Sequence, residues 1–159
     1  MRAELYWICK VEDGRLGVMP RPRGGDWLFD EVTSLRELGV DIVISLLAAH
    51  EIEELDICEE ENACKANQIT FISFPIVDRS VPRSVQAAIE LAESVLANLR
   101  SGMNVVIHCR AGIGRSSLMA ASVLKLSGKS VDEAFQMIES ARGCAVPDTS
   151  QQREWVAGI

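Results

Sequence analysis

The chain has 159 residues, which is enough for one domain with a sizeable core and too few for a second. Its hydrophobic fraction of 48% and charged fraction of 25% are ordinary for a globular protein, and no apolar stretch approaches membrane-spanning length. The net charge of −7 argues against nucleic acid and against a basic membrane-binding face, so we expect neither kind of partner.

The cysteines and the amino end predict a reducing, cytoplasmic location. The amino end lacks the apolar core of a signal peptide. The cysteine count is odd and the spacing matches neither a disulfide framework nor a zinc site; the positions are Cys9, Cys58, Cys64, Cys109 and Cys144. We therefore expect no metal and no cofactor.

The first half of the chain predicts a hairpin followed by alternating helices and strands. Asp26 is a candidate cap for a helix that ends at Gly39, and the acidic stretch 50–67 predicts one or two helices with solvated glutamates. Apolar runs predict strands that are buried on both faces. In chain order we expect hairpin strands over 5–10 and 15–19, a helix over 26–38, and buried strands over 40–47 and 69–74.

The second half continues the alternation. Apolar residues recur at helical spacing over 85–99, and a buried strand over 105–107 precedes a helix that begins near Arg115 and is apolar nearly all round. Ser130 and Glu133 have capping-box spacing for another helix, and a short last helix carries Trp155. This order predicts an α/β fold in which helices flank a mainly parallel central sheet, with the ligand site beyond the carboxyl ends of the strands.

Residues 108–116 join a predicted strand to a predicted helix through a turn that contains Gly112 and Gly114. Backbone N–H groups of such a turn can point inward and bind an anion, and the positive end of the following helix adds to the field. Arg115 supplies a planar donor for phosphate, and the same field stabilises a thiolate at Cys109. A purely structural cysteine in a glycine turn would need neither the arginine nor the paired glycines.

The string from His108 to Ser116 resembles the signature His-Cys-x-x-Gly-x-x-Arg-Ser/Thr of the protein tyrosine phosphatase superfamily. The resemblance implies a cysteine-phosphatase fold and a cysteinyl-phosphate formed on Cys109. It also implies that Ser116 assists departure of the thiolate and that His108 supports the loop. The phosphate would be bound by the loop residues, which are Arg110, Ala111, Gly112, Ile113, Gly114 and Arg115.

A second catalytic group is expected because an alkoxide or phenoxide leaves slowly unless it is protonated. Asp78 follows the carboxyl end of the strand predicted over 69–74 and precedes Cys109 by about thirty residues. The stretch 75–82 resembles the acid loop of small stand-alone dual-specificity phosphatases, including bacterial and archaeal ones. This resemblance, which runs from about Gly14 to the carboxyl end, implies that Asp78 protonates the leaving group as the general acid and later helps to deprotonate the water that hydrolyses the cysteinyl-phosphate. In isolation, Asp78 could equally be an Asp in a surface turn.

The chain departs from these relatives near its carboxyl end. Many relatives carry a glutamine that positions the hydrolytic water, and here the corresponding position falls on Pro147 or Asp148. Thr149 and Gln152 fit a capping box, which explains Gln152 without chemistry, so the water-positioning role is unassigned.

The sequence therefore predicts a single phosphatase domain over 1–159, monomeric and metal-free, that hydrolyses a phosphorylated protein or another phosphomonoester. Ala111 and Ile113 stand where some lipid phosphatases of the superfamily carry lysines, which favours protein or aryl phosphate over inositol phosphates and phospholipids. A non-catalytic phosphate-binding module needs only the cradle, and sulfur or arsenate transfer does not require Asp78; both alternatives are less consistent with the residues. Arg79, Arg83 and Arg110 are candidate contacts to acidic neighbours of the phosphate, whereas surface placement explains Arg21 and Arg23 equally well.

Overall fold

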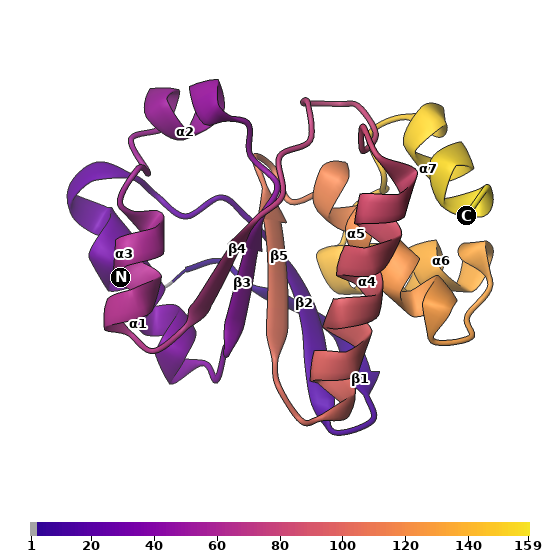
Figure 1. The fold of residues 1–159 in the computed structure, drawn as a ribbon, viewed down its shortest axis with the longest axis horizontal. Helices are drawn as coiled ribbons and strands as arrows, with labels where there is room; N and C mark the ends of the chain where they lie inside the picture. Colours follow the sequence, from indigo (N-terminus) through magenta and orange to yellow (C-terminus); the bar gives the residue numbers. More distant parts are fainter. Residues whose placement is uncertain (1–2) are drawn as a thin grey trace.

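The computed structural model describes residues 3–159 and contains one five-stranded sheet with helices on both faces (Figure 1). The strand order is β1-β2-β5-β3-β4, and every neighbouring pair is parallel except the hairpin of β1 and β2. The strands are β1 (Tyr6–Val11), β2 (Gly14–Pro20), β3 (Ile42–Ser45), β4 (Thr70–Ser73) and β5 (Val105–Cys109). The mainly parallel α/β sheet predicted from the sequence is confirmed.

Two hydrophobic cores lie on the two faces of the sheet. Residues such as Ile44 and Ile107 face the larger core, and Val43 and Val106 face the smaller one, because side chains alternate along each strand. The larger core is covered by α4 (Val85–Arg100), α5 (Arg115–Leu126), α6 (Val131–Arg142) and α7 (Ser150–Ala157). The smaller core is covered by α1 (Leu28–Glu37) and α3 (Glu60–Ala66), and α2 (Ala49–Glu54) lies above the carboxyl ends of the strands (Figure 1).

The predicted helix ends are confirmed in the second half of the chain. The capping boxes of Ser130 with Glu133 and of Thr149 with Gln152 both form, and Gly143 ends α6 in the left-handed conformation. Asp26 was predicted to cap the first helix, and this is wrong. It lies in a short 3-10 turn (Gly25–Trp27) that precedes α1 and makes no capping contact.

Two burial predictions also need correction. The strand predicted over 69–74 is not buried on both faces: β4 is an edge strand, with Thr70 and Ser73 exposed, since only β3 pairs with it. The stretch 50–67 does form two helices, α2 and α3, but Glu51 and Glu60 are buried rather than solvated. Both carboxylates have cationic or imidazole partners at the carboxyl ends of the strands, as described below.

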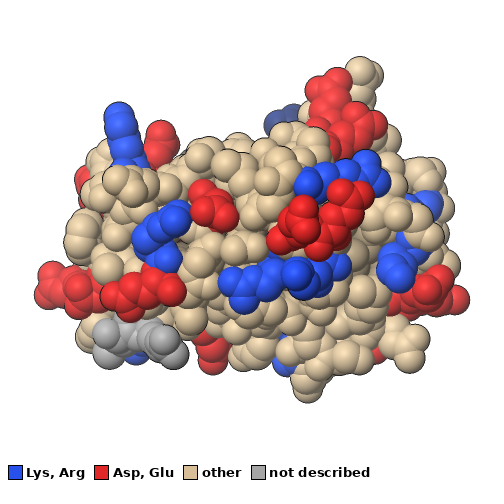
Figure 2. Space-filling model, turned by 90° about the horizontal axis from the view of Figure 1, so that it is seen from below, with Lys and Arg blue, Asp and Glu red and all other residues tan. Residues whose placement is uncertain are grey.

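The end of the sheet opposite to the carboxyl ends of the parallel strands carries charges of both signs (Figure 2). Figure 2 shows the molecule from below, the end opposite to the carboxyl ends of the parallel strands, where positive and negative side chains are interspersed. Ion pairs of this end include Arg36 with Asp41 (3.2 Å) and Arg100 with Glu12 (3.3 Å). The upper end carries the loop that follows β5.

Candidate active site

Cys109 is the last residue of β5, and Arg115 is the first residue of α5, so residues 110–114 form the connecting loop. The side chain of Cys109 points toward that of Ser116, with 3.4 Å between Sγ and Oγ. Both residues are buried, at 2% and 0% exposure. The strand-to-helix turn predicted over 108–116 is therefore formed, and it places a thiol at the positive end of α5.

Arg115 is almost completely buried and is held by groups from two other segments. Its Nη1 and Nη2 atoms donate to the two oxygens of Glu51 at 2.7 and 3.0 Å, a bidentate pair in which both side chains are 1% exposed. Nη1 also donates to the carbonyl of Ile76 at 2.9 Å. The orientation of the guanidinium is consequently determined by α2 and by the segment after β4.

The ionisation of both partners is stabilised by this pair. Burial favours the neutral form of each group, but the hydrogen bonds and the opposite charge outweigh it. The pKa of Glu51 is lowered because Arg115 and the backbone N–H of Ala48 donate to its carboxylate. The pKa of Arg115 is raised by Glu51 and by the charges of Cys109 and Asp78. The cationic form of Arg115 is thus favoured.

His108 supports the loop from the other core. Its Nε2 atom lies 2.6 Å from a carboxylate oxygen of Glu60 in α3, and its Nδ1 atom lies 3.4 Å from the carbonyl oxygen of Cys109. The imidazole is fully buried. These contacts connect the end of β5 to α3.

The loop backbone is fixed by contacts from both of its flanks. Arg142, at the end of α6, donates to the carbonyls of Gly112 and Ala111 at 3.1 and 3.0 Å. The backbone N–H of Arg21 donates to the carbonyl of Arg110 at 3.1 Å. Carbonyls that are bonded outward in this way leave the N–H groups of the loop free to point inward.

Asp78 lies beside this loop. Its Oδ1 atom is 3.0 Å from Nη2 of Arg115, and its side chain is 51% exposed. The structure thus brings the candidate acid next to the candidate phosphate-binding arginine, as expected from their positions at the same edge of the sheet. The acid loop is attached to α7, because the amide of Gln152 donates to the carbonyl of Ser80 at 3.1 Å.

Four other arginines named in the sequence analysis lie at the surface or form ion pairs. Arg79 and Arg83 are exposed, and Arg110 lies 3.6 Å from Glu54 at the surface. Arg23 forms a 2.5 Å ion pair with the buried Glu31 of α1, so it is not a freely solvated side chain.

Sequence reasoning missed Glu51, Glu60 and Arg142. The two glutamates lie in an acidic stretch where most carboxylates are solvated, and nothing in their spacing distinguishes the two that turn inward. Arg142 occupies the last turn of a helix, where a basic residue is ordinary. Their partners become visible only when distant segments are brought together.

Two further observations concern the part of the chain that the structure describes. Over residues 3–159, no helix has the length and hydropathy needed to cross a membrane, and no group of three or more His, Cys, Asp or Glu side chains is arranged to hold a metal ion.

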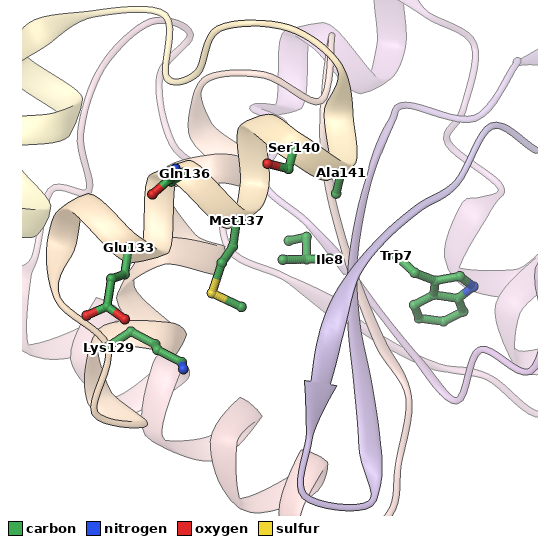
Figure 3. Close-up of a pocket in the computed structure, with 8 residues that line it drawn as sticks. All are labelled: Trp7, Ile8, Lys129, Glu133, Gln136, Met137, Ser140 and Ala141. Atoms are coloured by element: carbon green, nitrogen blue, oxygen red, sulfur yellow. The ribbon is translucent and has the colours of Figure 1, made fainter.

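A cavity of about 660 Å³ lies between β1 and α6, with Ile8 and Met137 pointing into it (Figure 3). It shares no residue with the loop after β5.

The sheet topology and the cysteine-arginine loop at its carboxyl edge together define the cysteine-phosphatase class of α/β proteins. The sequence model described as "Dual specificity phosphatase, catalytic domain" matches residues 30–157, so the chain belongs to the dual-specificity phosphatase family.

A similar viral protein is also named as a tyrosine phosphatase. A protein of Invertebrate iridescent virus 6 named "Putative tyrosine phosphatase 197R" is 30% identical over 105 residues, which cover 64% of this chain and 37% of the viral protein. The matched part thus spans little more than a third of that relative's length.

Solved structures show the same fold. Kinase associated phosphatase, in a form with its catalytic-site cysteine replaced by serine, superposes with a TM-score of 0.87 at 18% identity, covering 98% of this chain and 93% of that one. Tk-PTP in its active form has a TM-score of 0.77 at 26% identity, covering 94% of this chain and 93% of that one.

Proposed function

We propose that this protein is a cysteine-dependent phosphomonoester hydrolase of the dual-specificity type, with one phosphatase domain over residues 1–159. The observation that carries the proposal is the arrangement of Cys109, Ser116 and Arg115 on a single loop, with Asp78 3.0 Å from the same guanidinium. A binding module would need the cradle alone. The presence of a nucleophile and an acid beside it supports catalysis.

In the first step, the Cys109 thiolate attacks phosphorus, the bond to the ester oxygen breaks, and Asp78 protonates the leaving oxygen. Arg115 and the N–H groups of residues 110–115 hold the equatorial oxygens, where charge accumulates. Substrate phosphate would compete with Asp78 for Nη2 of Arg115 and so release the carboxyl group toward the leaving group.

In the second step, water attacks phosphorus and the sulfur leaves as thiolate. The carboxylate of Asp78, which gave up its proton in the first step, takes the proton that water loses. The hydroxyl of Ser116, 3.4 Å from Sγ, is placed to donate to that thiolate. The products are inorganic phosphate and the regenerated nucleophile, and no metal takes part in either step.

The substrate class follows from leaving-group chemistry and from the charges around the loop. Phenoxide departs more readily than alkoxide, so phosphotyrosine should be the best substrate, with phosphoserine and phosphothreonine detectable. Arg79 and Arg83 are exposed beside the acid and favour acidic residues near the phosphate, although Glu54 partly neutralises Arg110. The free state of the cysteines supports a reducing, cytoplasmic location, and we expect a monomer.

The test compares the unmodified protein with Cys109→Ser on p-nitrophenyl phosphate and on phosphopeptides. We expect Cys109→Ser to abolish phosphate release while still binding phosphopeptide, since the cradle remains. Cys58→Ser, at an exposed cysteine, is the matched control and should keep full activity. Vanadate should inhibit competitively, and EDTA should have no effect.

Residual activity of Cys109→Ser within tenfold of the unmodified protein would rule out the nucleophile. Binding without turnover by the unmodified protein would favour the binding module. Matched peptides with phosphotyrosine or phosphothreonine and with acidic or basic flanks test the substrate class. A clear preference for phosphothreonine or for basic flanks would contradict it.

A further inference from the structure

β1 is an edge strand whose apolar side chains are not fully covered. It pairs only with β2, so its other edge has no strand partner among residues 3–159. Every residue of β1 is partly or fully exposed, and all of its side chains except that of Lys10 are apolar or aromatic. A free edge of this kind is a template for a further strand, because its outward N–H and C=O groups lack partners.

Two adjoining cavities, which we call the β1 groove, follow this strand. The first, of about 660 Å³, lies between β1 and α6, and the second, of about 280 Å³, extends along residues 9–12. Lys129 and Met137 line both cavities. In Figure 3, Ile8 points toward Met137 across the groove, whereas Trp7 lies on the other side of β1. A strand added to the free edge of β1 would therefore find an apolar cavity on its α6 side.

The charges beside the β1 groove favour an acidic partner. Glu12 is paired with Arg100 at 3.3 Å, and Glu133 is engaged in the capping box at the start of α6. Lys10 and Lys129 are exposed, and within residues 3–159 neither forms an ion pair. The groove thus presents two lysines to a partner, although the net charge of the protein is −7. Complementarity then requires carboxylates on the partner.

We propose that the β1 groove is a docking surface for an extended, acidic segment of a partner protein, which adds a strand to the edge of β1. Alternate side chains of that segment face Met137 and should be apolar, and those between them lie on the side of Lys10. Lys10 is on that side because its neighbours Cys9 and Val11 both pack against the larger core. A second copy of this chain is less complementary, since it brings the same two lysines.

This surface is separate from the candidate active site. Neither cavity shares a residue with the loop after β5. Docking therefore does not depend on the proposed catalytic activity, and it is tested by binding alone.

The test uses a blocked hexapeptide in which valine and glutamate alternate, titrated into the whole protein by calorimetry and followed by amide chemical shifts. We expect binding, with the shifts confined to β1, α6 and the turn that carries Lys129. Replacing the glutamates with lysine should weaken binding roughly tenfold or more, because it reverses the charge complementarity. Placing the valines and glutamates in separate blocks should have a similar effect, because it removes the alternation of a strand.

N-methylation of the peptide separates strand pairing from side-chain contact alone. A strand uses the N–H groups of alternate residues to pair along one edge, so methylation of one alternate set should abolish binding and methylation of the other set should not.

Charge-reversed variants test the two lysines. The double variant Lys10→Glu, Lys129→Glu should bind the glutamate peptide roughly tenfold or more weakly, and it should stay folded because both side chains are exposed. Lys65→Glu, at an exposed position of α3, is the matched control and should bind as the unmodified protein does.

Four results would overturn the proposal. The first is no binding of the alternating peptide up to about 1 mM. The second is equal binding of the lysine peptide, and the third is equal binding of both N-methylated sets. The fourth is a dimer that forms through β1 without peptide, detected by ultracentrifugation and lost in Ile8→Asp, because the occupant would then be a second copy of this chain.

Discussion

At the residue scale, the decisive feature is that the guanidinium of Arg115 serves several groups at once. It donates to both oxygens of Glu51 and contacts Asp78, while its position at the start of α5 directs it toward the loop. The buried pair with Glu51 sets its orientation, and the contact with the exposed Asp78 is the one that substrate phosphate replaces in the proposed mechanism. One guanidinium thus makes a strong, buried contact with Glu51 and a separate contact with Asp78 that can be exchanged.

The proposed general-acid role of Asp78 predicts a loss of activity that depends on the leaving group. Asp78→Asn should slow hydrolysis of an alkyl or phenyl phosphate by roughly 10²–10⁴-fold, and p-nitrophenyl phosphate much less, because nitrophenolate needs little protonation. Steady-state kcat/KM on a series of aryl phosphates measures this. An equal loss across the series would contradict the acid role.

The Glu51–Arg115 pair predicts a stability loss that depends on pH. Glu51→Gln should destabilise the fold by about 3–5 kcal/mol at pH 7, since it leaves a buried cation without its partner. The folded-state pKa of Glu51 is lowered. Its contribution to the free energy of unfolding is therefore complete above the unfolded-state pKa of about 4.3 and is lost as the pH falls through the folded-state pKa.

Urea unfolding of both proteins at several pH values measures the difference. We expect the difference in the free energy of unfolding to shrink as the pH falls below the unfolded value and through the lowered folded-state pKa of Glu51, because the carboxylate of the unmodified protein is then protonated. Glu53→Gln, at an exposed position of the same helix, is the control and should show no such difference. If the difference in the free energy of unfolding between the unmodified protein and Glu51→Gln stays constant from neutral to acidic pH, the Glu51–Arg115 pair is not its cause.

At the element scale, the loop over residues 110–114 is shaped by its neighbours as much as by its own sequence. β2 lies directly under it: a Cβ atom on Gly112 would lie 2.6 Å from the carbonyl carbon of Met19 and 2.7 Å from the nitrogen of Pro20. Gly112 also has a φ of +73°, in the left-handed region. Arg142 of α6 then binds the loop carbonyls from the other side.

This close approach predicts that Gly112→Ala displaces the loop. We expect at least a tenfold weaker affinity for vanadate, together with lower kcat/KM, because backbone atoms of β2 cannot move aside as a flexible side chain can. Gly143→Ala is the matched control: its φ is +76°, but nothing lies within 4 Å of a Cβ atom there.

The control should therefore lose about 1–2 kcal/mol of stability, the cost of a left-handed alanine, and retain vanadate binding. Inhibition constants and thermal unfolding of the two variants measure the comparison. Equal vanadate affinities would show that contact with β2 does not shape the loop.

At the scale of the whole molecule, the sheet divides the protein into a larger core under α4 to α7 and a smaller core under α1 and α3. Each core provides support for the site. Glu60, on α3 of the smaller core, binds His108 of β5, and Arg142, on α6 over the larger core, binds the loop. Local opening of either core is therefore expected to disturb the site.

Cys64 reports on the smaller core. It is fully buried in α3, and desolvation, with a smaller effect of the Glu60 and Glu61 charges, raises its pKa to about 12. At pH 8 we expect iodoacetamide to label the exposed Cys58 rapidly and Cys64 only as fast as the core opens, with a rate that rises with urea. Peptide mass spectrometry measures both rates. Labelling of Cys64 as fast as Cys58 in native buffer would show that α3 is not stably packed.

The sequence by itself determined the alternating order of elements, the strand-to-helix turn at 108–116 and the candidates Cys109, Arg115 and Asp78. It could do so because hydrophobic periodicity, caps and glycine turns act over a few residues. Only the tertiary structure decided which glutamates are buried and which strands lie at the sheet edges. Glu51 and Arg115 are far apart in the chain, and their pairing depends on burial and proximity, which no local pattern encodes.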